Sequence, residues 1–265
     1  LTIANAIELT GSNDPVVDTG AFNAALSGGV SGGGFITKQG SGVLTLSGAN
    51  TYTGATHVAQ GTLRAGATNT LSAASAHSVA AGATLELAGF DQRVASLGNS
   101  GTVSLLGATP GTTLTVTGAY VGSNGVLALG TVLDGNGPSD RLVLDGMSAS
   151  ASGRTSVQIT NVGGLGAQTS GNGVEVVGPI KGATTTAQST KDAFVLSGGH
   201  VDAGAYEYRL YAADAQGAGE NWYLRSSLMG SHAPDAVAAP LVTYRPEAAL
   251  YAAQPSQLRQ GSMAM

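Results

Sequence analysis

The sequence predicts an all-β solenoid: a right-handed parallel β-helix, capped by a β-hairpin-rich C-terminal region and followed by an extended tail. Three observations support this prediction. Short runs that alternate apolar residues with Thr or Ser recur through residues 1–133, separated by Gly, Asn or Pro-Gly corners. Glycine is abundant, at 41 of 265 residues, while only 10% of the chain is charged and 5% is aromatic. Coils that each place a few small or branched side chains in a thin core have this composition.

The first 133 residues predict a β-helical stem. Residues 1–9 alternate and predict a strand with one buried face. Residues 40–64 contain several short strands joined by tight corners, and the same rhythm persists up to residue 133. No LxxLxL ladder is present, which disfavours leucine-rich repeats. Single-residue corners without paired hairpins disfavour an antiparallel sandwich.

The sequence pattern changes after residue 133, and residues 134–225 predict the end and cap of the β-helix. Its strands are longer, and most of the large aromatic residues, with the single Trp, lie here. Residues 206–211 and 221–225 flank a polar loop and predict a hairpin. A solenoid end needs such residues because an open end exposes apolar surface and strand edges. Residues 226–265 are rich in Pro and Ala and predict an extended linker.

Composition excludes several classes of function. The chain has no cysteine, so it holds neither a disulfide framework nor a thiolate metal site. A net charge of −5 argues against nucleic acid as a partner, because such binding needs a basic face. No apolar run is long enough to cross a bilayer as a helix. Because the chain opens on a strand pattern rather than a signal peptide, we expect a fragment of a longer protein.

No motif predicts a catalytic, cofactor-binding or metal-binding residue. Residues 29–33 match GxSxG, but a nucleophile elbow needs a following helix, and here a bend and a strand follow. Asp134, Asn136 and Asp140 resemble part of a calcium loop without its distal Glu, so we expect a solvated turn. We also expect exposed, isolated charges at three further positions and surface placement for the histidines. These residues are Glu86, Asp91 and Arg93, and His57, His77, His200 and His232.

The cap supplies candidates for a folding nucleus. They are the large apolar residues of its predicted strands: Leu142, Leu144, Phe194, Leu196, Tyr206, Tyr208, Leu210, Trp222 and Leu224. We expect Trp222 to lie against Tyr206 or Tyr208 and to anchor the hairpin. Stacking of the aromatic residues on a sugar or a partner is the alternative, and a core role is favoured.

Two segments resemble a known family. Residues 42–56, followed by Gly61-Thr62-Leu63, resemble the passenger-associated transport repeat of type V autotransporters, and Phe35-Ile36 departs from its usual Leu. The second half resembles a pertactin-like autochaperone region. Its matching segments are residues 139–144, 194–196, 201–210 and 221–224. Residues 244–253 are similar to the segment that precedes the translocator barrel of this family.

The resemblance implies a role in secretion. It implies a passenger exported to the Gram-negative outer-membrane surface, or secreted after cleavage, whose C-terminal coils fold first and template the rest. The implied partner is the protein's own translocator barrel, which is not in this chain, and we expect a monomer. Two alternatives stay open. In the first, the β-helix is itself an adhesin for host cells or matrix, and in the second it is the stalk of an upstream protease or esterase head.

Overall fold

Short parallel strands stacked coil upon coil make up most of the described chain. The computed structural model describes residues 1–11 and 15–229. Every element in these ranges is a strand, so none of the described residues forms a helix able to cross a membrane. The predicted parallel β-helix with a hairpin-rich end is therefore confirmed. Of the predicted tail, residues 230–265 lie outside the described residues, and residues 226–228 belong to the last strand.

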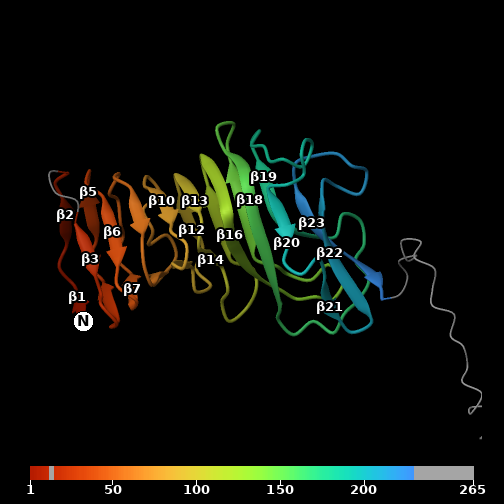
Figure 1. Cartoon of the computed structure of the whole chain (residues 1–265), viewed down its shortest axis with the longest axis horizontal. Coiled ribbons are helices and arrows are strands. Elements are labelled where there is room, and N and C mark those ends of the chain that lie inside the picture. Colours follow the sequence, from red (N-terminus) through yellow and green to blue (C-terminus); the bar gives the residue numbers. More distant parts are fainter. Residues whose placement is uncertain (12–14, 230–265) are drawn as a thin grey trace, which may run out of the picture. The chain divides into compact units, whose positions relative to one another are not determined.

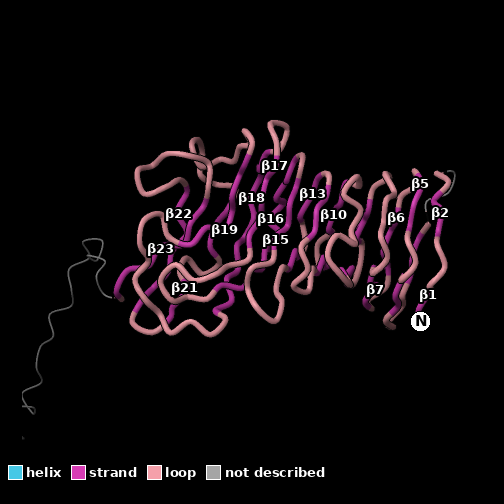
Figure 2. The backbone as a smooth tube through the Cα atoms, turned by 180° about the vertical axis from the view of Figure 1, so that it is seen from behind, coloured by secondary structure: helices cyan, strands magenta, loops and turns pink. Residues whose placement is uncertain are grey.

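Two rows of stem strands form one sheet, and they join at the long strand β16 (Ala119–Thr131). The first row contains β1 (Thr2–Ile3), β4 (Ala24–Leu26), β7 (Val43–Leu46), β9 (Thr62–Ala65), β11 (Thr84–Glu86) and β14 (Thr102–Ser104). The second contains β3 (Val16–Asp18), β6 (Ile36–Gln39), β8 (Thr56–Val58), β10 (Ala76–Val79) and β13 (Ser96–Asn99). Strands β18 (Ser150–Asn161) and β20 (Phe194–Leu196) extend the sheet beyond β16. Neighbouring strands stack side by side in both views (Figures 1 and 2).

The third side of the solenoid is less regular. It contains the pair β2 (Ile7–Leu9) and β5 (Val30–Gly32), and further along the chain β12 (Gln92–Val94), β15 (Thr113–Val116), β17 (Arg141–Asp145) and β19 (Val174–Ile180). All these neighbours pair in parallel. On this third side, some coils have turns and side-chain hydrogen bonds where other coils have a strand.

Stacked side chains fill the interior. Leu44 pairs with Leu63, Leu63 with Leu85, and Leu85 with Val103, and all four are fully buried. Alternation along each short strand produces this ladder, because every second side chain points inward. The same apolar position therefore recurs from coil to coil, which is the physical origin of the alternating sequence pattern.

Antiparallel strands close the C-terminal end. Strand β23 (Trp222–Leu228) pairs antiparallel with β19 and with β22 (Tyr206–Ala212), and β21 (Val201–Ala203) adds to β22. The hairpin predicted around the polar loop is thus confirmed. This antiparallel pairing ends the coil repeat, because β23 occupies the edge of β19 to which a further parallel strand would bind.

Candidate functional site

Asn50 is the corner residue of the coil that the sequence singled out. Its Oδ1 accepts a hydrogen bond of 2.8 Å from Val30 N, and its Nδ2 donates one of 2.5 Å to Thr70 O. Val30 and Thr70 belong to the preceding and the following coil. A single buried side chain therefore ties three successive coils together, and its own polar groups are satisfied.

Tyr52 begins a chain of buried hydroxyl groups. Its phenol shares a hydrogen bond of 2.7 Å with Thr56 Oγ1, which shares one of 2.9 Å with Ser75 Oγ. Burial raises the pKa of Tyr52, although these hydroxyl contacts partly oppose the shift. Tyr52 and Thr56 of the repeat thus act inside the core and are not available to a ligand.

Lys38 is fully buried beside the repeat. Its ammonium donates hydrogen bonds to Gln39 O and Gly40 O at 2.8 Å each and to Gln60 O at 3.1 Å. Burial lowers the pKa of this amine, and the charge of Asp18 opposes the shift. The side chain therefore binds the corners of two neighbouring coils through their carbonyl groups.

Two glycines of the repeat allow the coils to approach closely. A Cβ added to Gly48 would lie 2.2 Å from Gly28 O, and one added to Gly54 would lie 2.1 Å from Gly34 O. Real Cβ atoms do not come this near to a backbone oxygen, so a larger residue would push the coils apart.

His77 corrects the expectation that the histidines lie on the surface. It is 3% exposed, its Nδ1 donates to Ser75 O at 3.0 Å, and its Nε2 is buried without a partner. Burial lowers its pKa to about 4. His57 and His200 do lie at the surface, and His232 falls outside the described residues. The inward placement of His77 follows from its strand position, because it pairs with the buried Thr56.

An aromatic cluster packs between the last coils and the closing hairpin. Phe194 is its centre, with Tyr120 stacked at 5.8 Å between ring centroids and Trp222 edge-on at 5.4 Å. The Trp222 Nε1 donates a hydrogen bond of 3.0 Å to Thr185 Oγ1. The expected partners of Trp222 were therefore wrong. The antiparallel register places Tyr206 opposite Leu228 and Tyr208 opposite Ser226, toward the far end of the hairpin.

The nine proposed nucleus residues share one hydrophobic core. Seven are buried, and Tyr206 and Leu210 are partly buried against it. The hydroxyl of Tyr208 also donates to Ala167 O at 2.7 Å, which holds a long loop onto the cap. The core role predicted for most of these aromatic residues fits their burial, while their part in nucleation stays a prediction.

The turn that faintly resembled a calcium loop contains a residue that the sequence did not reveal. Asp140 is fully buried and accepts three backbone N–H bonds, from Gly111, Thr112 and Gly130. The expectation of a solvated turn holds for the exposed Asp134 and Asn136 and is wrong for Asp140. The signal available in the sequence was its position directly before the apolar run of the strand at residues 141–145.

The three charges expected to be isolated all have partners. Glu86 pairs with Arg64 at 2.8 Å, and Arg93 with Asp145 at 3.0 Å. Asp91 Oδ1 accepts a hydrogen bond from Thr113 N. These contacts join different coils, which sequence proximity does not reveal.

The remaining candidates offer little chemistry. Ser31 of the GxSxG match lies exposed in β5, and the described residues contain no helix to form a nucleophile elbow. Ligand atoms of His200, directly before β21, Asp202 in β21 and Glu207 in β22 lie within 4.8 Å of one another. Arg209 already pairs with Glu207 at 3.0 Å, and two of the three residues are exposed.

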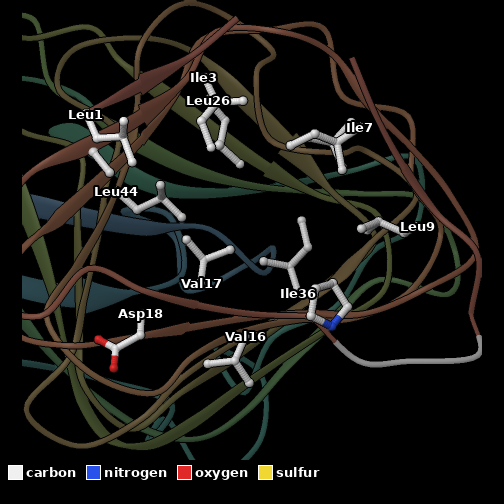
Figure 3. A pocket seen from close by; sticks show the side chains of 13 residues that line it. Leu1, Ile3, Ile7, Leu9, Val16, Val17, Asp18, Leu26, Ile36 and Leu44 are labelled. Atoms are coloured by element: carbon white, nitrogen blue, oxygen red, sulfur yellow. The ribbon is translucent and has the colours of Figure 1, made fainter. Parts of the chain in front are cut away.

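The N-terminal end of the solenoid contains an apolar cavity of about 350 Å³. Leu1, Ile3, Ile7 and Leu9 line it on one side, and Val16 and Val17 approach them from another segment (Figure 3). The buried core residues Leu26, Ile36 and Leu44 also line it, so the cavity continues the interior ladder of the stem.

Comparison with known proteins supports both resemblances. The family model of the passenger-associated transport repeat matches residues 36–65, and that of the type 1 autochaperone domain matches residues 93–210. The chain is 37% identical to the uncharacterized protein YuaQ of Escherichia coli, and the match covers 75% of the chain. Over 98% of the chain it is 35% identical to the adhesin BmaC autotransporter of Brucella suis. Over 54% of the chain it is 34% identical to the autotransporter adhesin AIDA-I of Escherichia coli.

The chain spans only a small part of these relatives: 14% of YuaQ, 7% of BmaC and 10% of AIDA-I. The matched family models nevertheless fall on the coil tied by Asn50 and on a region that includes Tyr120 and Phe194 of the aromatic cluster. Both models, and the relatives named as autotransporters, indicate export to the outer-membrane surface or secretion. The chain therefore contains a passenger-associated transport repeat and a type 1 autochaperone domain, as its autotransporter relatives indicate.

Proposed function

We propose that residues 134–225, the cap, are the folding nucleus of the passenger, and that residues 1–133, the stem, form a non-enzymatic stalk that folds onto it. Residues 226–265 then link the cap toward the translocator barrel. The observation that carries this proposal is the packing of Phe194 against Trp222 of the closing hairpin, with both rings buried inside the cap.

The cap has what a nucleus requires. Strands β22 and β23 lie near each other in sequence, so their pairing closes a short loop at a small entropic cost. Phe194 and Trp222 bury large apolar surfaces in the same place. By contrast, the stem strands before β16 have only two to four residues each, so each coil there gains stability only when a neighbouring coil is already folded.

Coil-by-coil folding would then give export a direction. Each coil that folds outside the cell adds to a preformed edge and cannot slide back through a pore as an unfolded thread. No ATP is available outside the cell, so the free energy of folding is a source of this bias. The nine core residues of the cap are the candidates that set the rate of the first step.

Deletion of residues 140–224 in the intact autotransporter tests the proposal. We expect the passenger to reach the surface in a form sensitive to added protease. A matched control deletes residues 63–84, because Leu63 pairs with Leu85 and the deletion removes one coil while preserving the row. The control should stay resistant. Normal, protease-resistant display of the 140–224 deletion would contradict the proposal.

A non-enzymatic stalk predicts no labelling by serine-hydrolase probes. Ser31 is the residue to monitor, because it is the serine of the GxSxG match and is exposed. Labelling that is lost in Ser31→Ala would overturn this part of the proposal. Sedimentation of the purified chain tests the accompanying expectation of a monomer.

A second candidate function is adhesion. It is favoured by the names of two relatives, BmaC and AIDA-I, which are described as adhesins. The test is binding of the purified chain to immobilised matrix proteins and to host cells. Saturable binding that a heat-unfolded sample lacks would support adhesion by this segment, and no binding would leave adhesion to other parts of the passenger.

A further inference from the structure

Strand β17 is bracketed by two buried carboxylates. Asp140 precedes it and Asp145 ends it, with exposed fractions of 0% and 8%. In its row, β17 lies between β15 of the stem and β19 of the cap, and β19 is in turn covered by β23. The strand is therefore where stem and cap meet on the third side of the solenoid.

Asp140 is satisfied by groups that come earlier in the chain. Its Oδ1 accepts from Gly111 N at 2.8 Å and from Thr112 N at 2.9 Å, and its Oδ2 accepts from Gly130 N at 2.7 Å. Among the described residues no Lys, Arg or His forms an ion pair with it. Three backbone N–H groups of the stem thus supply its stabilisation, and without them the buried carboxylate would be costly.

Backbone hydrogen bonds around Asp140 make its pairing with the stem specific to one register. Asp140 N donates to Gly130 O at 2.8 Å, and Arg141 N donates to Thr112 O at 2.9 Å. Gly130 and Thr112 therefore each exchange bonds with the Asp140 region in both directions. A slip of one residue would break these bonds together and would also turn the neighbouring side chains to the wrong face.

Asp145 makes the corresponding contact at the other end of the strand. Its Oδ2 lies 3.0 Å from Arg93 Nη1, and its Oδ1 lies 2.8 Å from Lys181 Nζ. Arg93 belongs to the stem strand β12, whereas Lys181 follows β19 of the cap. One carboxylate therefore bridges the two parts, and both cations hold its pKa below the usual range.

We propose that β17 is the template strand at which the folded cap captures the arriving stem, and that Asp140 and Asp145 are the positioning residues that fix its register. The inference rests on the proposed function, in which the cap folds first. In that order Asp140 presents two carboxylate oxygens that lack donors. The N–H groups of Gly111, Thr112 and Gly130 arrive later, and only the native register satisfies both oxygens.

Refolding of the full chain from urea tests the proposal. Trp222, the single Trp, reports the cap by fluorescence, and pulsed hydrogen exchange reports stem amides in residues 24–105. In Asp140→Asn we expect an unchanged Trp222 phase and stem protection slowed by about tenfold or more. Asp145→Asn should slow stem protection by about threefold. Stem protection at the wild-type rate in Asp140→Asn, or equal slowing of the Trp222 phase, would overturn the proposal.

Two further variants keep the test decisive. Gly130→Ala leaves the carboxylate intact but places a Cβ 3.1 Å from Asp140 Oδ2, and it should also slow stem protection. If Asp140→Asn does not fold, Gly130→Ala takes its place in the test. Lys38→Met also removes three hydrogen bonds of a buried charge, but far from β17. It should speed unfolding of the stem while residues 113–131 gain protection at the wild-type rate.

The same data separate this proposal from the one on which it rests. If wild-type stem amides gain protection before Trp222 is buried, the cap is not the nucleus and the proposed function fails. If the cap folds first and Asp140→Asn and Gly130→Ala both leave the stem rate unchanged, only the template strand fails.

Discussion

The indole Nε1 of Trp222 donates a hydrogen bond of 3.0 Å to Thr185 Oγ1. The indole ring meets Phe194 edge-on, so this residue joins the closing hairpin to the interior by both its polar and its apolar parts. The Thr185 hydroxyl in turn donates to Glu220, whose backbone O lies 2.8 Å and whose Oε2 lies 2.9 Å from Oγ1. This arrangement makes the cap the first place to examine by mutation.

Replacing Trp222 by Ala should lower the free energy of unfolding by about 3–5 kcal/mol, because it removes a buried aromatic side chain. Trp222→Phe keeps an aromatic ring and should cost less. Urea unfolding followed by circular dichroism measures both. A double-mutant cycle with Thr185→Val isolates the hydrogen bond, and additive effects would show that it contributes nothing to the pairing.

Asn50→Ala should destabilise the chain by roughly 2–4 kcal/mol, because it leaves Val30 N and Thr70 O without their partner. The neighbouring exposed Thr51 provides the control, and Thr51→Ala should change stability by less than about 0.5 kcal/mol. Equal effects of the two substitutions would contradict the role of Asn50 in tying the coils.

His77 should make stability depend on pH. Its pKa is about 4 in the folded chain, below the ordinary 6.5, so the unfolded chain binds the proton more readily. Stability is therefore complete above about pH 6.5 and falls as the pH drops toward 4, by roughly 2–3 kcal/mol at pH 4.5. Urea unfolding at pH 7.5 and 4.5 measures this loss. His77→Leu should remove this part of the pH dependence, and an unchanged difference between the two pH values would count against it.

Gly54→Ala should disrupt the repeat coil, because the new Cβ would lie 2.1 Å from Gly34 O. We expect a loss of several kcal/mol and faster hydrogen exchange in residues 30–65. Gly33 serves as the matched control, since a Cβ there meets nothing nearer than Thr53 Oγ1 at 4.0 Å. Wild-type stability in Gly54→Ala would show that the coils can move apart freely.

The alternating pattern was sufficient to predict the coils, because burial at positions such as Leu44 and Leu63 depends only on strand periodicity. The aromatic enrichment of the C-terminal half likewise located the cap. Pairing between distant coils was not predictable. The partners of Trp222 depend on a hairpin register that no local residue reveals.

The sequence also did not reveal which charged residues lie in the interior. Lys38 and Asp140 each lie in a polar stretch, where a charge normally indicates solvent exposure. Their burial is stabilised by backbone groups of other coils, which come near only after folding. His77 was missed for a related reason, because its inward orientation is fixed by its pairing with Thr56.

The length of the paired strands also has a mechanical meaning. Strand β1 has 2 residues, whereas β18 has 12 and pairs with β16 along its length. In a stalk stretched along its axis, the hydrogen bonds between coils bear the load in series, so the weakest junction yields first. The junctions between the short stem strands would separate one at a time, while the long β16–β18 junction would hold. Under load the stalk would thus extend in steps, and the junction that resists most lies beside the cap.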